Sequence, residues 1–199
     1  MKAHNKASAW FDELYQKNKN THENIPWARL AVNPLLQSYL DEEKLHQGTA
    51  LVIGCGLGDD AKALEDAGYD VTAIDVSQTA LDLAKEHFVG SSIKFIKQDI
   101  FEYEKQFDFV FEAFTIQSLP VEFREKMIKA VADTVAVGGE LLLVAHKREA
   151  IRQGPPWPLT QEDVDLFKSH GLTELSFELH TEESKVSQTR FRVLYKKQG

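Results

Sequence analysis

The feature that most constrains this chain is an apolar run that ends in a glycine-rich turn. Residues 51–53 are Leu, Val and Ile, and the turn that follows carries Gly54, Gly56 and Gly58. Glycine at such positions lets a ligand approach the backbone and permits the positive φ of a tight turn. A second apolar run ends about twenty residues later in Asp75, where a carboxylate can accept hydrogen bonds from both hydroxyls of a ribose. The pattern predicts a strand, a turn and a helix that bind a nucleoside-containing ligand.

The turn departs from the Gly-x-Gly-x-x-Gly fingerprint of dinucleotide-binding proteins. Its third glycine, Gly58, comes one residue early, and Asp59 and Asp60 follow it at the expected start of a helix. The amino end of a helix favours anions, so two carboxylates there would repel a diphosphate and attract an amino group. A nicotinamide-dependent oxidoreductase is therefore the less favoured alternative. The simpler alternative is a strand-to-helix turn that binds no ligand.

Strand and helix patterns alternate along the chain, which is typical of an α/β fold. Strands are predicted at 49–53, 70–74, 93–97, 107–113, 139–146, 172–180 and 188–196. Helices are predicted at 59–67, 77–87, 120–135 and 160–169. No helix pattern separates the last two strands, so the polar connection 181–187 predicts a hairpin. We therefore predict a Rossmann-like, seven-stranded, mostly parallel sheet with a C-terminal antiparallel strand and helices on both faces.

Composition indicates a single domain, residues 1–199, because a chain of 199 residues with 43% hydrophobic content can bury one core. The formal charge of −8 and the pI near 5.4 argue against a nucleic-acid-binding surface, which needs clustered Lys and Arg. Residues 1–6 have no signal-peptide pattern, and no apolar stretch reaches the roughly 18 residues that span a bilayer. The single cysteine and the seven histidines show no metal-site spacing. We expect a cytoplasmic protein with no metal and with neither nucleic-acid nor membrane partners.

Several segments resemble the class I S-adenosylmethionine-dependent methyltransferases. The turn at 52–58 resembles their first motif, Asp75 matches their ribose-binding acid, and Gln98-Asp99-Ile100 looks like their adenine-binding segment. Two segments resemble the family's fourth and fifth strands: 107–112 and 137–144. The resemblance implies S-adenosylmethionine as cofactor, with S-adenosylhomocysteine as product. It implies cofactor contacts for Trp27, Gly54, Cys55, Gly56, Gly58, Asp75, Val76, Asp99, Ile100 and Glu112.

Two regions outside this core resemble the thiopurine and thiol or halide methyltransferases, which act on small molecules. The run 10–15, Trp-Phe-Asp-Glu-Leu-Tyr, and the pair Pro26-Trp27 resemble an amino-terminal segment that closes over the cofactor. The family often has an acid where this chain has Ala28. The Gly-Pro-Pro-Trp run at 154–157 resembles a loop that borders the acceptor pocket. The resemblance implies a lid at 1–46 and a cofactor-binding core at 47–199.

The segment after the predicted fourth strand bears on the acceptor. It lacks the Asn-Pro-Pro-aromatic or Asp-Pro-Pro-aromatic run of enzymes that methylate amino groups of bases and glutamine. Glu112 has three readings: it accepts a hydrogen bond from the methionine amino group, it acts near the acceptor, or it is a carboxylate at a solvated strand end. His146 is the nearest candidate base, but no residue is assigned a catalytic role. We predict a methyltransferase that acts on a small molecule at sulfur or another soft nucleophile. The alternative is a protein that binds the cofactor without transferring its methyl group.

Overall fold

In the computed structural model, the strands form one seven-stranded sheet in the order β3-β2-β1-β4-β5-β7-β6. The structure describes residues 3–19, 21, 25, 27–28, 30–42, 47–148, 154–182 and 188–199. The chain forms two units, Met1–Asp99 and Ile100–Gly199, each with its own dense set of internal contacts. The mostly parallel sheet with antiparallel pairing at its C-terminal end confirms the predicted fold class.

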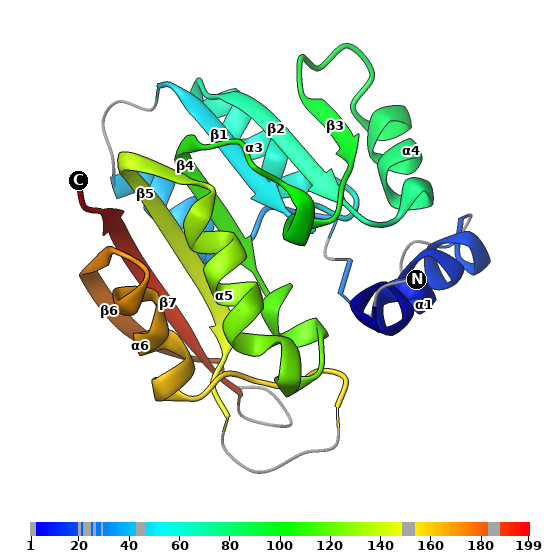
Figure 1. Cartoon of the computed structure of the whole chain (residues 1–199). Coiled ribbons are helices and arrows are strands. Elements are labelled where there is room, and N and C mark those ends of the chain that lie inside the picture. Colours follow the sequence, from blue (N-terminus) through cyan, green and yellow to red (C-terminus); the bar gives the residue numbers. More distant parts are fainter. Residues whose placement is uncertain are drawn as a thin grey trace. The chain divides into compact units, whose positions relative to one another are not determined.

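The first unit carries a parallel three-stranded part of the sheet. Its elements are α1 (Ala3–Lys17), α2 (Pro34–Glu42), β1 (Thr49–Ile53), α3 (Asp59–Ala67), β2 (Asp70–Asp75), α4 (Gln78–His87) and β3 (Lys94–Lys97). Strand β2 pairs in parallel with both β1 and β3. Their apolar, β-branched residues suit strands that are covered on both faces. Helix α1 contacts α4, and Figure 1 shows α1 beside the start of that helix.

Local signals set the ends of the helices in this unit. Helix α3 begins after Gly58 and ends at Gly68, both of which have left-handed backbone angles, with φ of 90° and 111°. The backbone N–H of Gly68 returns to carbonyls of the last helical turn, which is the usual way glycine closes a helix. Helix α4 begins after Ser77, whose side chain accepts a hydrogen bond from Ala80 N. Because β1 and β2 are parallel, the glycine turn that follows β1 and the end of β2 lie at the same edge of this part of the sheet.

The second unit carries the remaining four strands. Its elements are η2 (Ile100–Glu102), β4 (Phe107–Ala113), η3 (Ile116–Ser118), η4 (Val121–Phe123), α5 (Arg124–Asp133), β5 (Val135–His146), α6 (Gln161–Ser169), β6 (Leu172–Glu182) and β7 (Gln188–Lys197). Strands β4 and β5 are parallel, and β7 pairs antiparallel with both β5 and β6. Helices α5 and α6 contact each other and lie over these strands in Figure 1. Antiparallel β7 therefore lies between β5 and β6, which confirms the predicted C-terminal antiparallel strand.

Most predicted elements are found within a few residues of their expected ends, but the helix predicted at 120–135 is wrong at both ends. Pro120 is extended, with ψ of 151°, and the one-turn η4 precedes α5. Thr134 ends the helix, and β5 already begins at Val135, four residues before the predicted start of that strand. The β4–β5 register breaks after Phe107, and Gly138 in this stretch has φ of 80°. An irregular start of β5 therefore replaces the end of the expected helix.

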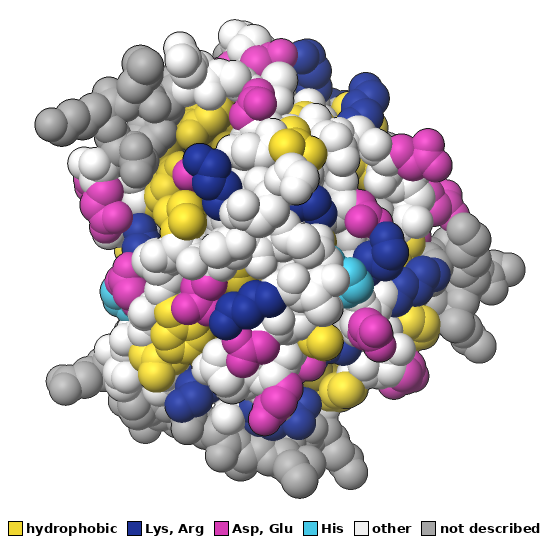
Figure 2. All heavy atoms as spheres, turned by 60° about the vertical axis from the view of Figure 1, so that its left-hand side comes forward, with side chains coloured by type: hydrophobic (Ala, Val, Ile, Leu, Met, Phe, Trp, Pro, Cys, Tyr) yellow, Lys and Arg dark blue, Asp and Glu magenta, His cyan; other side chains and the backbone are white. Residues whose placement is uncertain are grey.

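Two observations concern the partners that the sequence predicts: the search for membrane-spanning helices and the distribution of charge on one face of the protein. Within the described ranges, no helix combines the length and the apolar character needed to cross a bilayer. The face drawn in Figure 2 shows Lys and Arg interleaved with Asp and Glu. The division into a lid at 1–46 and a core at 47–199 stays a prediction.

Candidate functional site

The glycine turn of the first unit has the backbone that its sequence predicts. Gly54, Gly56 and Gly58 have φ of 63°, 52° and 90°, all in the left-handed region. A Cβ on Gly56 would lie 2.9 Å from Tyr15 Oη, and one on Gly58 would lie 3.1 Å from the Phe95 ring. Glycine is therefore required at both positions for conformation and for space.

Asp75 is the last residue of β2 and contacts this turn directly. Its Oδ2 accepts a hydrogen bond from Gly56 N at 2.9 Å, and its Oδ1 accepts one from Ser77 N at 2.8 Å. The side chain is 9% exposed, and burial raises its pKa although these hydrogen bonds act in the opposite direction. An ionised carboxylate can accept about four hydrogen bonds. Val76 N–H also stabilises the ionised form, and the capacity that remains can accept from hydroxyl donors.

An aromatic cluster from the amino-terminal segment packs beside the turn. Trp27 Nε1 donates a hydrogen bond to Tyr15 Oη at 2.8 Å. The Trp27 ring makes edge contacts with Trp10, Phe11 and Tyr15, with centroids 5.6, 5.5 and 6.0 Å away. Tyr15 is buried, whereas Trp27 is 39% exposed. Pro26, the partner of Trp27 in the predicted pair, lies outside the described residues. Tyr15 thus links the predicted lid residue Trp27 to the glycine turn.

Two carboxylates fix the amino-terminal segment to this unit. Asp12 Oδ1 accepts hydrogen bonds from Ser77 Oγ at 2.7 Å and from Thr79 N at 3.1 Å, which joins α1 to the start of α4. Asp60 Oδ1 accepts one from Asn33 N at 2.6 Å. The sequence suggested that Asp59 and Asp60 attract a cationic ligand. In the structure, Asp60 instead holds the backbone at Asn33, directly before α2. The sequence does not reveal the role of Asp12, because its partners are more than 60 residues away.

The other residues predicted to bind the cofactor differ in their burial. Cys55 is half-buried, and burial raises the pKa of its thiol, so it remains protonated and fits the role of a small turn residue. Val76 is 38% exposed directly after Asp75. Asp99 is half-buried after β3, and the preceding Gln98 donates its backbone N–H to Asp75 O at 3.0 Å. Ile100, at the start of the second unit, is buried in η2.

Glu112 lies near the end of β4 in the second unit and is fully buried. Its Oε1 accepts a hydrogen bond from Ile116 N at 2.5 Å, and its Oε2 has no hydrogen-bond partner among the described residues. Burial raises the pKa of Glu112 to about 8, although backbone hydrogen bonds and Arg124 act in the opposite direction. The alternative of a solvated strand end is wrong, because η3 turns back and covers the carboxyl group.

Three side chains of the second unit meet at the carboxyl end of β5. The Phe114 ring stacks on His146 with centroids 4.9 Å apart, and the guanidinium carbon of Arg190 lies 5.7 Å from the Phe114 centroid. His146 and Arg190 are direct neighbours across β5 and β7. The sequence pointed to His146 and to the segment after β4 that contains Phe114, but not to Arg190, because the register of β5 with β7 has no local sequence signal. The positive φ of Phe114 (64°) has no such signal either.

The Gly-Pro-Pro-Trp loop is fixed to the same unit by buried polar groups. Trp157 N donates to Gln117 O at 2.7 Å, and Arg124 Nη2 donates to Trp157 O at 2.6 Å. The Gln117 side chain also accepts a hydrogen bond from His146 N at 2.8 Å. A Cβ on Gly154 would overlap the Trp157 indole. The loop is therefore held in one position beside the end of β5.

Comparison with known proteins decides the family. The model of the thiopurine S-methyltransferase (TPMT) family matches residues 13–193. The chain belongs to this family. The thiocyanate methyltransferase 1 of Brassica oleracea is 29% identical over 180 residues, which cover 84% of this chain and 79% of that protein. The thiocyanate methyltransferase 1 of Arabidopsis thaliana is 31% identical over 153 residues, which cover 73% of this chain and 66% of that protein.

A solved structure supports the fold of this thiopurine S-methyltransferase family member. The N-methyltransferase NodS of Bradyrhizobium japonicum, in complex with S-adenosylhomocysteine, superposes with a TM-score of 0.70 at 22% identity and covers 92% of this chain and 97% of that one. The resemblance to S-adenosylmethionine-dependent methyltransferases that act on small molecules is confirmed. The individual cofactor-binding residues stay predictions.

Proposed function

We propose that this chain binds S-adenosylmethionine at the glycine turn and transfers its methyl group to the sulfur of a small acceptor. The observation that carries the proposal is the geometry of Asp75, which is buried at the end of β2, holds the turn through Gly56 N and can still accept from a ligand hydroxyl. Membership of a sulfur methyltransferase family and the relatives named for thiocyanate support the reaction type.

The residues of the first unit fit this cofactor. Asp75 would accept the ribose hydroxyls, and the turn at 54–58, whose three glycines have positive φ, would contact the methionine part through its backbone. Val76 and Asp99 would flank the adenine, with Trp27 as a lid. When bound, the cofactor supplies an electrophilic methyl group on a positively charged sulfur.

Two residues of the second unit are proposed for the same ligand. Ile100 would pack against the adenine, and Glu112 would accept a hydrogen bond from the amino group. The Oε2 atom of Glu112 is a buried acceptor that has no hydrogen-bond partner among the described residues. A cationic amino group would favour the ionised form of this carboxyl group, which burial disfavours.

The contribution of this chain to rate is positioning and exclusion of water. Holding two reacting groups in line can supply on the order of 7 to 11 kcal/mol. An aromatic cluster such as that of Trp10 and Trp27 can attract a cation by roughly 0.5 to 2 kcal/mol. We assign no residue as a base, because an anionic sulfur needs none. Small-molecule acceptors and a cytoplasmic location complete the proposal, and the net charge of −8 favours such acceptors over nucleic acid.

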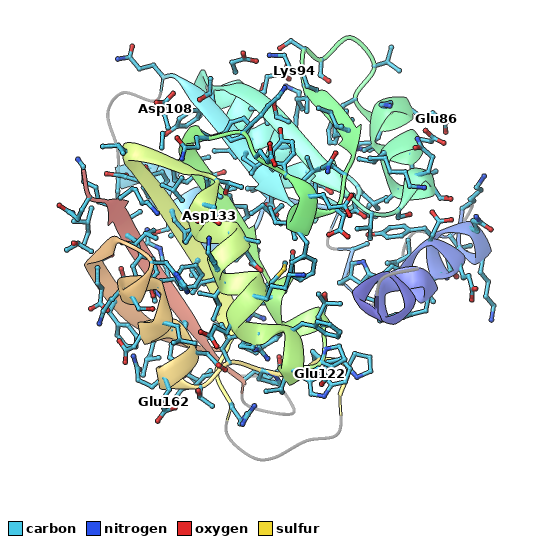
Figure 3. All side chains as sticks on the ribbon, viewed as in Figure 1. Glu86, Lys94, Asp108, Glu122, Asp133 and Glu162 are labelled. Atoms are coloured by element: carbon cyan, nitrogen blue, oxygen red, sulfur yellow. The ribbon has the colours of Figure 1, made fainter. Side chains whose placement is uncertain are left out.

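The test is turnover with defined acceptors. Purified protein is incubated with S-adenosylmethionine and thiocyanate, 2-mercaptoethanol or a thiopurine, and S-adenosylhomocysteine and the methylated acceptor are measured by mass spectrometry. Asp75→Asn should lose activity. Asp70→Asn, which removes the exposed ion pair between Asp70 and Lys94 at the other end of β2, should retain it; Lys94 is labelled in Figure 3. Cofactor binding without a methylated product from any acceptor would favour the alternative of a binding protein.

A further inference from the structure

The cluster of Phe114, His146 and Arg190 lies where ligands bind in folds of this kind. Phe114 follows β4, His146 ends β5, and Arg190 is the neighbour of His146 on β7. In open α/β sheets, ligands bind outside the carboxyl ends of the parallel strands. The cluster belongs to the second unit and uses none of the residues assigned above to the cofactor.

The backbone of Phe114 is strained in a way that serves this cluster. Its φ of 64° is an outlier for a bulky residue, and its N–H donates to Val144 O at 3.0 Å. Such strain persists where the surrounding structure holds it, and it concentrates at functional sites. Here the strained residue carries the ring that meets both His146 and Arg190.

Basic side chains flank Arg190 within the described part of β6 and β7. Its neighbour across β6 is His180, whose Nε2 lies 2.8 Å from Glu178 Oε2. The other oxygen of Glu178 accepts a hydrogen bond from the buried Arg192 at 2.6 Å. The carboxylate of Glu178 therefore has two basic partners of its own. The half-buried guanidinium of Arg190 offers five N–H donors in one plane, which can serve an anion in addition to other contacts.

We propose that Arg190, supported by Phe114 and His146, binds the acceptor as an anion, so that a sulfur nucleophile that is already an anion at neutral pH, such as thiocyanate, is preferred to a neutral thiol. This inference rests on the proposed function and assigns the specificity of the same reaction. Phe114 and His146 are positioning residues: the Phe114 ring stacks on His146 and lies 5.7 Å from the guanidinium carbon of Arg190.

The charge balance of the reaction gives a kinetic signature. The lone pair of the acceptor sulfur forms the new S–C bond, the bond from the methyl group to the sulfonium breaks, and its electron pair stays on the departing sulfur. An anion and a cation become two neutral molecules, and no proton is released. The negative charge of the acceptor decreases towards the transition state. Arg190 therefore stabilises the bound ground state at least as strongly as it stabilises the transition state. Loss of Arg190 should therefore raise KM without lowering kcat.

The experiment compares two acceptors in the wild type, Arg190→Gln and Arg190→Lys. Arg190→Gln should raise the KM for thiocyanate about 10-fold to 100-fold, the range expected for a charge-assisted hydrogen bond. The KM for 2-mercaptoethanol, mostly neutral at pH 7, should change less than about 3-fold, and Arg190→Lys should recover part of the loss. Lys196→Gln removes an exposed charge near the other end of β7 and is the matched control.

A binding measurement separates this inference from the proposed function. Thiocyanate is titrated calorimetrically into each protein in the presence of S-adenosylhomocysteine, and only Arg190→Gln should lose the binding signal. Turnover in the wild type combined with equal KM changes for both acceptors, or with a fall in kcat alone, would overturn the role of Arg190 and leave the proposed function intact. Thiocyanate binding that depends on Arg190 but occurs without turnover would support the anion site and contradict the methyl transfer. Absence of both binding and turnover in the wild type would contradict both.

Discussion

The buried carboxyl group of Glu112 makes a sharp prediction about stability. Its pKa is about 8 in the folded chain, whereas the ordinary pKa of a glutamate side chain, which applies to the unfolded chain, is 4.5. Between these two values the folded state holds a proton that the unfolded state has lost, so stability falls as pH rises. The slope is about 1.4 kcal/mol per pH unit, which corresponds to roughly 3 kcal/mol at pH 7. Above the folded pKa the loss levels off.

Glu112→Gln keeps the size of the side chain and its acceptor for Ile116 N but cannot ionise. The unfolding free energy of the wild type should therefore fall relative to that of the variant as pH rises, by about 1.4 kcal/mol per pH unit between about pH 5 and 8. Urea unfolding at each pH measures this difference. Glu122→Gln, at an exposed position before α5 (Figure 3), should give a flat difference. A flat difference for Glu112→Gln as well would refute the assignment of a raised pKa to this group.

Three further changes test the architecture around the site. Gly56→Ala should cost about 1 to 2 kcal/mol for the left-handed backbone, plus the contact with Tyr15 Oη, and adding Tyr15→Phe should recover part of the loss in urea unfolding. Thr160→Ala removes the capping box of α6 and should cost about 1 kcal/mol, whereas no loss would mean that the cap is dispensable. Asp12→Ala should speed hydrogen exchange in α1, because its bonds to Ser77 and Thr79 are lost. Desolvation alone would raise the pKa of Asp12, but its hydrogen bonds with Ser77 and Thr79 lower this pKa below the ordinary value. The stability that the ionised Asp12 contributes should therefore be lost as pH falls through the lowered pKa.

Much of the fold could be predicted because its signals are local. The apolar runs at 49–53 and 107–113 predict strands with the same ends that the structure shows. Glycine stops and the Ser77 cap place α3 and α4 within a residue. Irregular backbone is harder to predict: periodicity extends the helix across Pro120 and Val135, although a one-turn segment and an early strand occupy its two ends.

The site is predictable only where residues close in sequence form it. The glycine turn and Asp75 belong to one strand–helix–strand unit, so their spacing places them together. The contact of Asp12 with Ser77 spans 65 residues, and the neighbouring positions of His146 and Arg190 depend on a strand register. The burial of Glu112 depends on η3 folding back over β4, which no pattern near that residue indicates.

The central claim is that the turn at 54–58 and Asp75 bind S-adenosylmethionine. Calorimetric titration of the wild type with S-adenosylmethionine, and separately with NADH, tests it most directly. We predict binding of S-adenosylmethionine with a Kd on the order of micromolar, about 8 kcal/mol of binding free energy, and no binding of NADH. Absence of S-adenosylmethionine binding, or binding of NADH in its place, would contradict the claim.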